Sequence, residues 1–408
     1  MRVPKLQARR WDWVLMLCVI LLFAMGSLAI YSATHHPDSA RHGYFWRHLV
    51  GAGIAAAAFV VFLLIPLRLV EDWAWLFYGL ALLLLVAVLF IGVEEYGARR
   101  WFRLGFFRFQ PSEMAKLATI IVLARFLAVK RVDLSRLRTL AYALALAVVP
   151  FALVLREPDL GTAGAYIGLA LPMFIWGGIP RLVLFLMVSP LITIALNHHL
   201  FAWIIFVLGA ALVFWRLRIA WGVVAIFLLA HSSLMLGAPR VIAGLEPYQQ
   251  ERIKTFLNPE ADPSGAGYQV LQSKIAIGSG RVVGKGFLQG TQSGLAFLPQ
   301  QHTDFIFSVV GEEWGFLGST VVIALFAVLI GRAVLLARNG RSRFAGYLAV
   351  GIGGLVFYHA ALNVAMTMGL FPVTGLPLPF MSYGGSFLIT MMAAMGLLQN
   401  VAVHRFDY

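Results

Sequence analysis

The amino-acid sequence predicts an all-α fold, a polytopic membrane protein built as a bundle of transmembrane helices. Hydrophobic residues make up 61% of the 408 residues and charged residues only 12%, whereas a soluble domain has about 45–50% and about 25%. Many apolar runs approach the ~20 residues that a helix needs to cross a bilayer. These runs are continuously apolar rather than alternating, which argues against membrane strands.

About twelve spans can be placed along the chain, and ten is the alternative if two of the three between residues 181 and 237 are merged or re-entrant. The first apolar run follows several basic residues, as in a signal peptide. It is longer than a typical signal-peptide core, so we interpret it as an uncleaved span. The expected spans are 11–31, 47–65, 73–92, 113–129, 139–155, 160–178, 181–197, 200–216, 219–237, 305–333, 345–368 and 386–403.

Basic residues recur in the connections on one side of this arrangement. By the positive-inside rule these connections are cytoplasmic, and an even number of spans places both termini there. The net charge of +14 is therefore explained by orientation signals and does not indicate nucleic-acid binding. The inner basic residues are Arg68, Lys130, Arg131, Arg136, Arg138, Arg181, Arg216, Arg218, Arg338, Arg341, Arg343 and Arg405.

The longest connection, about 238–304, precedes the third-last span and is extracytoplasmic by parity. Within it Leu271, Ile275 and Gly278 share one helical face, which suits a short helix on the membrane surface. We find no internal repeat and no separate soluble domain, so residues 1–408 are expected to form one membrane domain. The single cysteine, Cys18, excludes a disulfide within the chain.

One carboxylate, Asp304, stands where this connection meets the apolar run 305–310. An ionisable group at such a boundary is costly unless it has a function. His302 lies two residues earlier, but a lone histidine is a weak signal and a simple loop residue is the alternative. Glu312 and Glu313, two turns further on, are candidates for paired structural groups. Asp304 is therefore the leading candidate for a catalytic side chain.

Cations gather on the same outer side of the membrane. Residues 93–112 carry four arginines, an unusual density for an outer loop, although the charge rule is only statistical. Lys274 and Lys285 lie in the long outer connection. Arginine and lysine bind phosphates through charge-assisted hydrogen bonds, so an outward-facing anion site is expected. The four arginines are Arg99, Arg100, Arg103 and Arg108.

Two further carboxylates lie at the starts of spans. Glu113 is in the first turn of a span, where a capping carboxylate and a functional group are equally good interpretations. Lys116 is one turn deeper and can pair with it, and an ion pair at membrane depth favours function. Asp159 follows Pro158 in a tight turn, and a helix cap is the leading alternative there to a substrate contact.

The segment 375–386, which contains Ser382, has two prolines and three glycines and cannot form a regular helix. Irregular backbone at a membrane edge is tolerated where protein buries it or water reaches it. We expect this segment to line the same outer cavity, with a plain connector as the alternative. Cations beside carboxylates suit a substrate with a strongly anionic part and a hydroxyl group to be activated. No metal-ligand pattern is recognisable, so the cofactor is unknown and a divalent cation stays open.

Eight ordered segments, spread over nearly the whole chain, resemble the SEDS family of shape, elongation, division and sporulation proteins. The resemblance is closer to the elongation branch than to the division branch, on account of 284–286 and 290–293. The segments are GARRW at 97–101, QPSE at 110–113, EPDLGT at 157–162, YQQER at 248–252, GAGYQ at 265–269, QSKIAIGSG at 272–280, FLP with HTDF between 297 and 305, and 377–386.

The resemblance implies a peptidoglycan glycosyltransferase of the bacterial cytoplasmic (inner) membrane. Its substrate would be lipid II, the undecaprenyl-diphosphate-linked disaccharide-pentapeptide, polymerised during cell elongation and cell-shape maintenance. Asp304 corresponds to the catalytic carboxylate of the family, and Trp101, Glu113, Lys116 and Asp159 fall on positions of its central cavity. The implied partners are a class B penicillin-binding protein, which is a transpeptidase, and membrane proteins of the elongation complex.

The expected reaction begins when Asp304 takes the proton from an acceptor sugar hydroxyl. The oxygen then attacks the anomeric carbon of the growing chain, and Arg99, Arg100, Lys116 and Lys274 stabilise the departing diphosphate. A lipid II flippase, a division-type polymerase and a scaffold for cell-wall proteins are the alternatives. The ionisable residues gather at the outer face rather than the midplane, which argues against a flippase. Members of the family have ten spans, so this chain is expected to carry about two more.

Overall fold

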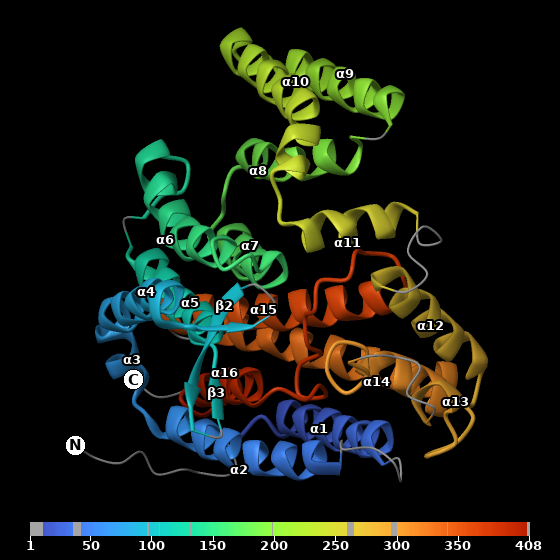
Figure 1. Ribbon diagram of the computed structural model, residues 1–408. Coiled ribbons are helices and arrows are strands. Elements are labelled where there is room, and N and C mark those ends of the chain that lie inside the picture. Colours follow the sequence, from blue (N-terminus) through green and yellow to red (C-terminus); the bar gives the residue numbers. More distant parts are fainter. Residues whose placement is uncertain are drawn as a thin grey trace. The chain divides into compact units, whose positions relative to one another are not determined.

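The computed structural model describes residues 11–405 apart from 36–41, 96–97, 106, 131, 198, 259–264, 295–299 and 341. Most of the described chain is helical (Figure 1). Contacts divide the chain into two compact units, Met1–Gly177 with Thr255–Tyr408, and Gly178–Lys254. The expectation of one membrane domain stays a prediction. Of the segments that resemble the SEDS family, Gly97 and 297–299 lie outside the described residues.

Every expected span corresponds to a helix, because each is a long apolar run bounded by polar or helix-breaking residues. A short helix, α3 (Leu67–Asp72), follows Pro66 in an inner connection. The spans correspond to α1 (Trp13–Thr34), α2 (His42–Leu64), α4 (Ala74–Ile91), α5 (Pro111–Ala128), α6 (Leu137–Leu155), α7 (Leu160–Trp176), α8 (Arg181–Ala195), α9 (Leu200–Arg216), α10 (Trp221–Ala243), α14 (Ile306–Asn339), α15 (Arg343–Thr367) and α16 (Gly385–Val403).

Helix length bears on the number of spans. Within the described residues, eight helices are long and apolar enough to cross a membrane. The apolar helices α7, α8 and α9 are shorter, with 17, 15 and 17 residues, and α5 carries three charged side chains. Among the described residues, α8, α9 and α10 are separate helices. The structure therefore favours twelve helices that correspond to expected spans over a count in which two of these three merge.

Contacts between helix ends agree with the predicted orientation. Asp12, just before α1, accepts a hydrogen bond of 2.7 Å from Arg332 near the end of α14. Asn400 near the end of α16 donates to the carbonyl oxygens of Phe62 and Ile65 at the end of α2, at 3.0 and 2.6 Å. These four helix ends were all expected on the cytoplasmic side.

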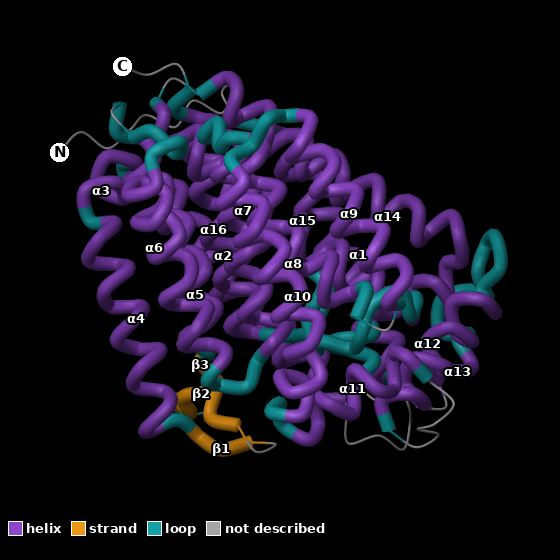
Figure 2. The backbone as a smooth tube through the Cα atoms, turned by 90° about the horizontal axis from the view of Figure 1, so that it is seen from above, coloured by secondary structure: helices purple, strands orange, loops and turns teal. Residues whose placement is uncertain are grey.

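The outer segment between α4 and α5 forms a small antiparallel sheet of β1 (Val93–Glu95), β2 (Ala98–Leu104) and β3 (Phe107–Phe109). The sequence argument against strands concerned the spans, which are helical; it did not predict this sheet in the outer segment. Figure 2 shows the strands at one end of α4 and α5. The segment is rich in aromatic residues, and Gly105, which directly follows β2, has φ +60°; a glycine beside aromatic-rich runs is a hairpin signal.

The long outer connection contains α11 (Pro247–Leu257), α12 (Ala266–Ser279) and α13 (Thr291–Gly294). The predicted short helix around 271–278 is confirmed as α12. Leu271 and Ile275 on its predicted face are 53% and 43% exposed, as a helix on a membrane surface would be. The opposite side of α12 packs against α14.

The core of the larger unit is formed by α15 and α16. Of the residues in an apolar 18-residue stretch of each helix, 67% and 89% are buried, whereas the share is only 28% in α2, α4 and α6. Apolar side chains exposed on these outer helices suit contact with lipid. Helix α15 packs against α14, α7 and α5, and α16 packs against α2. Polar side chains on α15 therefore face protein rather than lipid.

Candidate active site

Asp304 lies directly before α14, partly buried, with its main chain held from two sides. Its N–H donates to the carbonyl oxygen of Gln300 at 3.1 Å. Its own carbonyl oxygen accepts from Asn363 Nδ2 of α15 at 2.8 Å. The same Asn363 nitrogen donates to the carbonyl oxygen of Leu376 at 2.7 Å. Asp304 thus stands where α14, α15 and the segment that begins near residue 376 meet.

The segment 375–386 borders Asp304, as expected. Ser382 Oγ donates to the carbonyl oxygen of Thr303 at 2.6 Å and accepts from the N–H of Leu378 at 2.8 Å. The N–H of Tyr383 donates to the carbonyl oxygen of His302 at 2.9 Å. Because the hydroxyl of Ser382 bonds to backbone groups, this residue holds the loop in place beside Asp304.

His302 is buried, with 8% of its surface exposed. Its ring lies 4.6 Å from the ring of Tyr44 in α2 and 5.7 Å from that of Tyr383. The ring is thus packed into an aromatic group that joins α2 to the loop beside Asp304. His302 is more than a simple loop residue.

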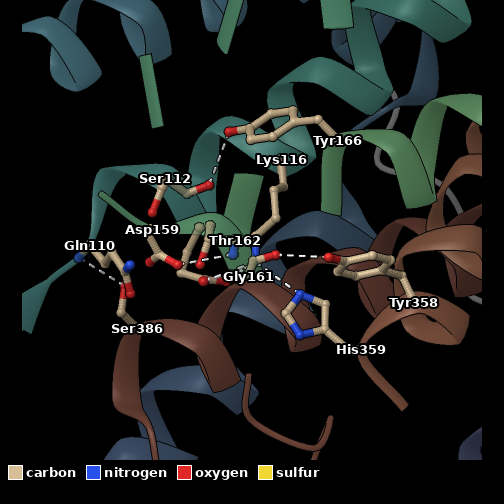
Figure 3. Close-up of polar contacts among 11 residues, drawn as sticks. Gln110, Ser112, Lys116, Asp159, Gly161, Thr162, Tyr166, Tyr358, His359 and Ser386 are labelled. Atoms are coloured by element: carbon tan, nitrogen blue, oxygen red, sulfur yellow. Dashed lines mark hydrogen bonds and ion pairs between the residues drawn. The ribbon is translucent and has the colours of Figure 1, made fainter. Parts of the chain in front are cut away.

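Lys116 and Glu113 form a buried ion pair in α5. The Lys116 nitrogen lies 2.9 and 2.8 Å from the two carboxylate oxygens of Glu113, and 3.1 Å from Nε2 of His359 in α15. Lys116 has no exposed surface. Figure 3 shows Lys116 and His359 pointing toward each other between their helices. The predicted ion pair is confirmed, and a buried pair needs such additional partners to be tolerated.

Three polar residues of α15, each four positions from the next, connect these groups. His359 contacts Lys116, Asn363 holds Asp304, and the carbonyl oxygen of Thr367 accepts from Ser273 of α12 at 2.6 Å. A four-residue spacing places them on one helical face. The sequence interpretation missed them, although polar residues at helical spacing inside an apolar span are a recognisable signal.

Asp159 caps α7 by accepting a hydrogen bond from the N–H of Thr162 at 3.0 Å, so the helix-cap interpretation is correct. The cap lies close to α15, because Tyr358 donates to the carbonyl oxygen of Gly161 at 2.9 Å. Figure 3 shows Asp159 near the contact of Lys116 with His359. A substrate contact by Asp159 remains a prediction.

The outer arginines differ in their contacts. Arg100 Nε donates to the carbonyl oxygen of Glu157 at 2.8 Å, which joins β2 to the turn between α6 and α7. Arg99 donates to the carbonyl oxygen of Phe90 at 3.2 Å and pairs with Glu94 at 3.4 Å in an exposed position. Trp101, partly buried, is paired with Val93 across the sheet.

The two outer lysines also differ. Lys274 is exposed on α12, and the end of its side chain lies against Gly369, whose φ is +69°. Lys285 forms an ion pair with Glu312 of α14 at 2.8 Å, and Ser32 of α1 donates a hydrogen bond to Glu313. Glu312 and Glu313 are therefore paired structural groups, as expected. The structure places Lys285 in an ion pair rather than beside Asp304.

Within the described residues, no group of three or more His, Cys, Asp or Glu side chains is arranged to hold a metal ion.

Glu157 is a buried carboxylic acid beside this site. It is 1% exposed, and among the described residues neither of its carboxylate oxygens has a hydrogen-bond partner. The pKa of Glu157 is raised to about 9, chiefly by burial and also by the charge of Asp159, while Arg100 opposes the increase. The side chain is therefore a neutral acid at pH 7.

Replacing Glu157 by Gln is expected to raise the thermal stability of the purified protein above pH 7. The pKa is raised from its usual value of 4.5 to about 9, so the folded chain binds more protons and its stability falls as pH rises between these values. The penalty is on the order of 3 kcal/mol at pH 7. Melting temperatures measured from pH 6 to 9 should fall for the wild type and stay flatter for Glu157→Gln. Glu94→Gln, at an exposed position, is the control; equal slopes in all three proteins would contradict the assignment.

The fold and the site define a polytopic membrane protein with a carboxylate held at one end of the helix bundle. The model of the cell cycle protein family that comprises FtsW, RodA and SpoVE matches residues 12–202 and 175–406. The chain belongs to this family, which is the SEDS family expected from its motifs. The two matches overlap at residues 175–202, where α8 lies, in the region expected to hold the additional spans.

Relatives match over nearly their whole length. Peptidoglycan glycosyltransferase MrdB of Escherichia coli (strain K12) is 36% identical over 97% of this chain and 95% of its own. Peptidoglycan glycosyltransferase RodA of Treponema pallidum (strain Nichols) is 34% identical over 96% and 97%. A chain in a solved peptidoglycan synthase complex is 29% identical, with a TM-score of 0.73, over 98% of this chain and 99% of that one. These relatives favour the RodA branch of the family over the FtsW branch.

Proposed function

We propose that this protein is a peptidoglycan glycosyltransferase of the inner membrane that polymerises lipid II during cell elongation. The observation that carries the proposal is the placement of Asp304, whose main chain is held by Asn363 and whose preceding residue is held by Ser382. A base must lie within hydrogen-bond reach of the proton it removes, and a fixed backbone provides that precision. Relatives named peptidoglycan glycosyltransferase, aligned over nearly the whole chain, support the same activity.

Asp304 is the base in this reaction. It accepts the proton of the 4-hydroxyl of the acceptor's GlcNAc, and the oxygen attacks the anomeric carbon of MurNAc in the growing chain. The bond to undecaprenyl diphosphate breaks, and the negative charge leaves with the diphosphate. Lys274, exposed on α12 next to Ser273, which hydrogen-bonds to Ser308 four positions after Asp304, is the cation best placed to attract that charge.

Lys116 contributes differently, because Glu113 already neutralises its charge. Buried ion pairs of this kind specify a geometry more than they bind a further ion. Lys116 also contacts His359, one turn from Asn363, so it supports the helix that holds Asp304.

The partners that fit this function are lipid II, the lipid bilayer, a class B penicillin-binding protein and other membrane proteins of the elongation complex. A polymerase alone cannot crosslink peptides, so a transpeptidase is required. The solved relative within a peptidoglycan synthase complex supports this type of assembly.

Purified protein in detergent is expected to convert lipid II into glycan strands, detected by gel electrophoresis. Detergent leaves no compartment across which a lipid could be moved, so polymer formation separates an enzyme from a flippase. Failure to form polymer, together with movement of lipid II across vesicle membranes, would contradict the proposal. Restoration of shape to cells that lack their elongation polymerase, but not of division, distinguishes the RodA role from the FtsW role.

A further inference from the structure

Helix α14 is two helical segments rather than one. It contains 34 residues, and Gly315 interrupts it with φ 63° and ψ −157°. Residues 316–339 alone exceed the ~20 residues needed to cross a bilayer. The nine residues from 306 to 314 form a separate arm that begins two positions after Asp304. The direction of this arm determines where Asp304 lies.

The loop 280–286 fills the interruption. The N–H groups of Lys285 and Gly286 donate to the carbonyl oxygens of Glu312 and Glu313, at 3.0 and 2.9 Å. On the other side of the interruption, the N–H of Phe316 donates to the carbonyl oxygen of Arg281 at 2.9 Å. Backbone groups released by the interruption are thus paired with the loop, as a membrane environment requires.

Close approach of the two backbones requires glycine. A Cβ atom on Gly280 would overlap the carbonyl oxygen of Gly311, and one on Gly284 would overlap that of Glu313. Gly284 also has φ +85°, which disfavours other residues. The loop and the arm therefore pack as one unit.

Side chains complete this connection. Glu312, with no exposed surface, accepts at one carboxylate oxygen from Lys285 Nζ at 2.8 Å, from the N–H of Gln292 at 2.9 Å and from Thr291 Oγ1 at 3.2 Å. Charge-assisted hydrogen bonds of this kind are stronger than neutral ones. Glu313, the next residue, is bound by Ser32 of α1, so the arm is held on two sides.

We propose that Lys285 and Glu312 are positioning residues, whose ion pair sets the direction of the arm 306–314 and thereby places Asp304. This inference rests on the proposed function, in which Asp304 is the base. Glu312 lies eight positions after Asp304, about 12 Å at the rise of an α-helix. A rotation of about 5° at Glu312 displaces Asp304 by about 1 Å, and a misplacement of that size can reduce a rate about 10²-fold.

The test compares Lys285→Met, Glu312→Gln and the double variant in the detergent lipid II assay, with kcat and KM measured separately. Each single variant is expected to lower kcat about 10- to 100-fold and to leave KM within about threefold. The kcat of the double variant should be no lower than that of the less active single variant, because the two residues act as a unit. Lys285→Arg, which keeps the ion pair, should recover most of kcat.

A direct role of Lys285 in binding diphosphate predicts the opposite pattern. Lys285→Met would then raise KM, and Glu312→Gln would release the lysine and lower KM. That result, or an unchanged kcat in both single variants, would overturn the inference. Arg136→Gln is the matched control, since it removes an exposed ion pair with Asp133 on the inner side.

Hydrogen exchange provides a second measurement that does not depend on activity. The amides of Lys285, Gly286 and Phe316 should exchange faster in Glu312→Gln than in the wild type, while those of α16 stay protected. Unchanged exchange at these amides would also overturn the inference. If the wild-type protein made no glycan, the proposed function would fail, and exchange would still report whether the ion pair holds the arm.

Discussion

Replacing Asp304 by Asn is expected to abolish glycan polymerisation while leaving the protein folded in the membrane. Asparagine has the size of aspartate but cannot accept the proton from a sugar hydroxyl, and a positioned base contributes about 10²–10⁴-fold to a rate. The contacts with Gln300 and Asn363 use only the main chain of Asp304, so the substitution leaves them intact. The measurement is the initial rate of glycan-strand formation from lipid II by purified protein.

Asp133→Asn is the matched control for this substitution, because Asp133 lies in the connection between α5 and α6 and its partners among the described residues are the nearby Ser135 and Arg136. It should polymerise at the wild-type rate. A near-normal rate in Asp304→Asn would remove Asp304 from the mechanism. Aggregation of Asp304→Asn in size-exclusion chromatography would instead indicate a role of its carboxylate in folding.

Replacing Lys116 by Met is expected to destabilise the protein far more than the loss of an exposed ion pair would. It leaves the carboxylate of Glu113 buried without its cation, and breaking a buried ion pair from one side costs about 3–5 kcal/mol. It also removes the hydrogen bond to His359, on the helix that holds Asp304. Melting temperature and polymerisation rate should both fall.

The double variant Lys116→Met with Glu113→Gln separates stability from activity. Replacing both charges of a buried pair is often neutral for stability, so the melting temperature should recover while the rate stays low. Arg125→Gln is the control, since its pairs with Glu71 and Asp72 lie at 3.7 and 3.5 Å in partly exposed positions and are worth about 0–1 kcal/mol. If Lys116→Met lowered the melting temperature no more than Arg125→Gln does, the buried ion pair would not have the proposed role.

The helices, their orientation and the leading catalytic candidate were predictable from the sequence. A span is a local property, because apolar composition over ~20 residues is sufficient to define it. Basic residues such as Arg68 and Arg338 indicate the cytoplasmic side, and this signal is also local because it depends on the charges of short connections. Asp304 was recognisable because a carboxylate at the start of an apolar run is rare.

The hydrogen-bond and ion-pair partners of these residues were less predictable, because they come from elements far apart in the chain. Asn363 and His359 lie in an apolar span, and only the packing of α15 against α14 and α5 places them on Asp304 and Lys116. The cation at Lys285 was correctly identified as an outer charge, but its ion pair with Glu312 depends on a loop folding back over 27 residues.

The sequence by itself determined that this chain crosses a membrane many times, with clusters of basic residues on the cytoplasmic side and Asp304 on the outer side, since hydropathy and charge act over short segments. Tertiary structure alone decided that α14 is interrupted at Gly315, how β1, β2 and β3 pair in a sheet, and which cations remain exposed. The physical reason is that a broken helix or a paired charge is stable only where another segment supplies its hydrogen bonds. Which segment that is depends on the whole fold.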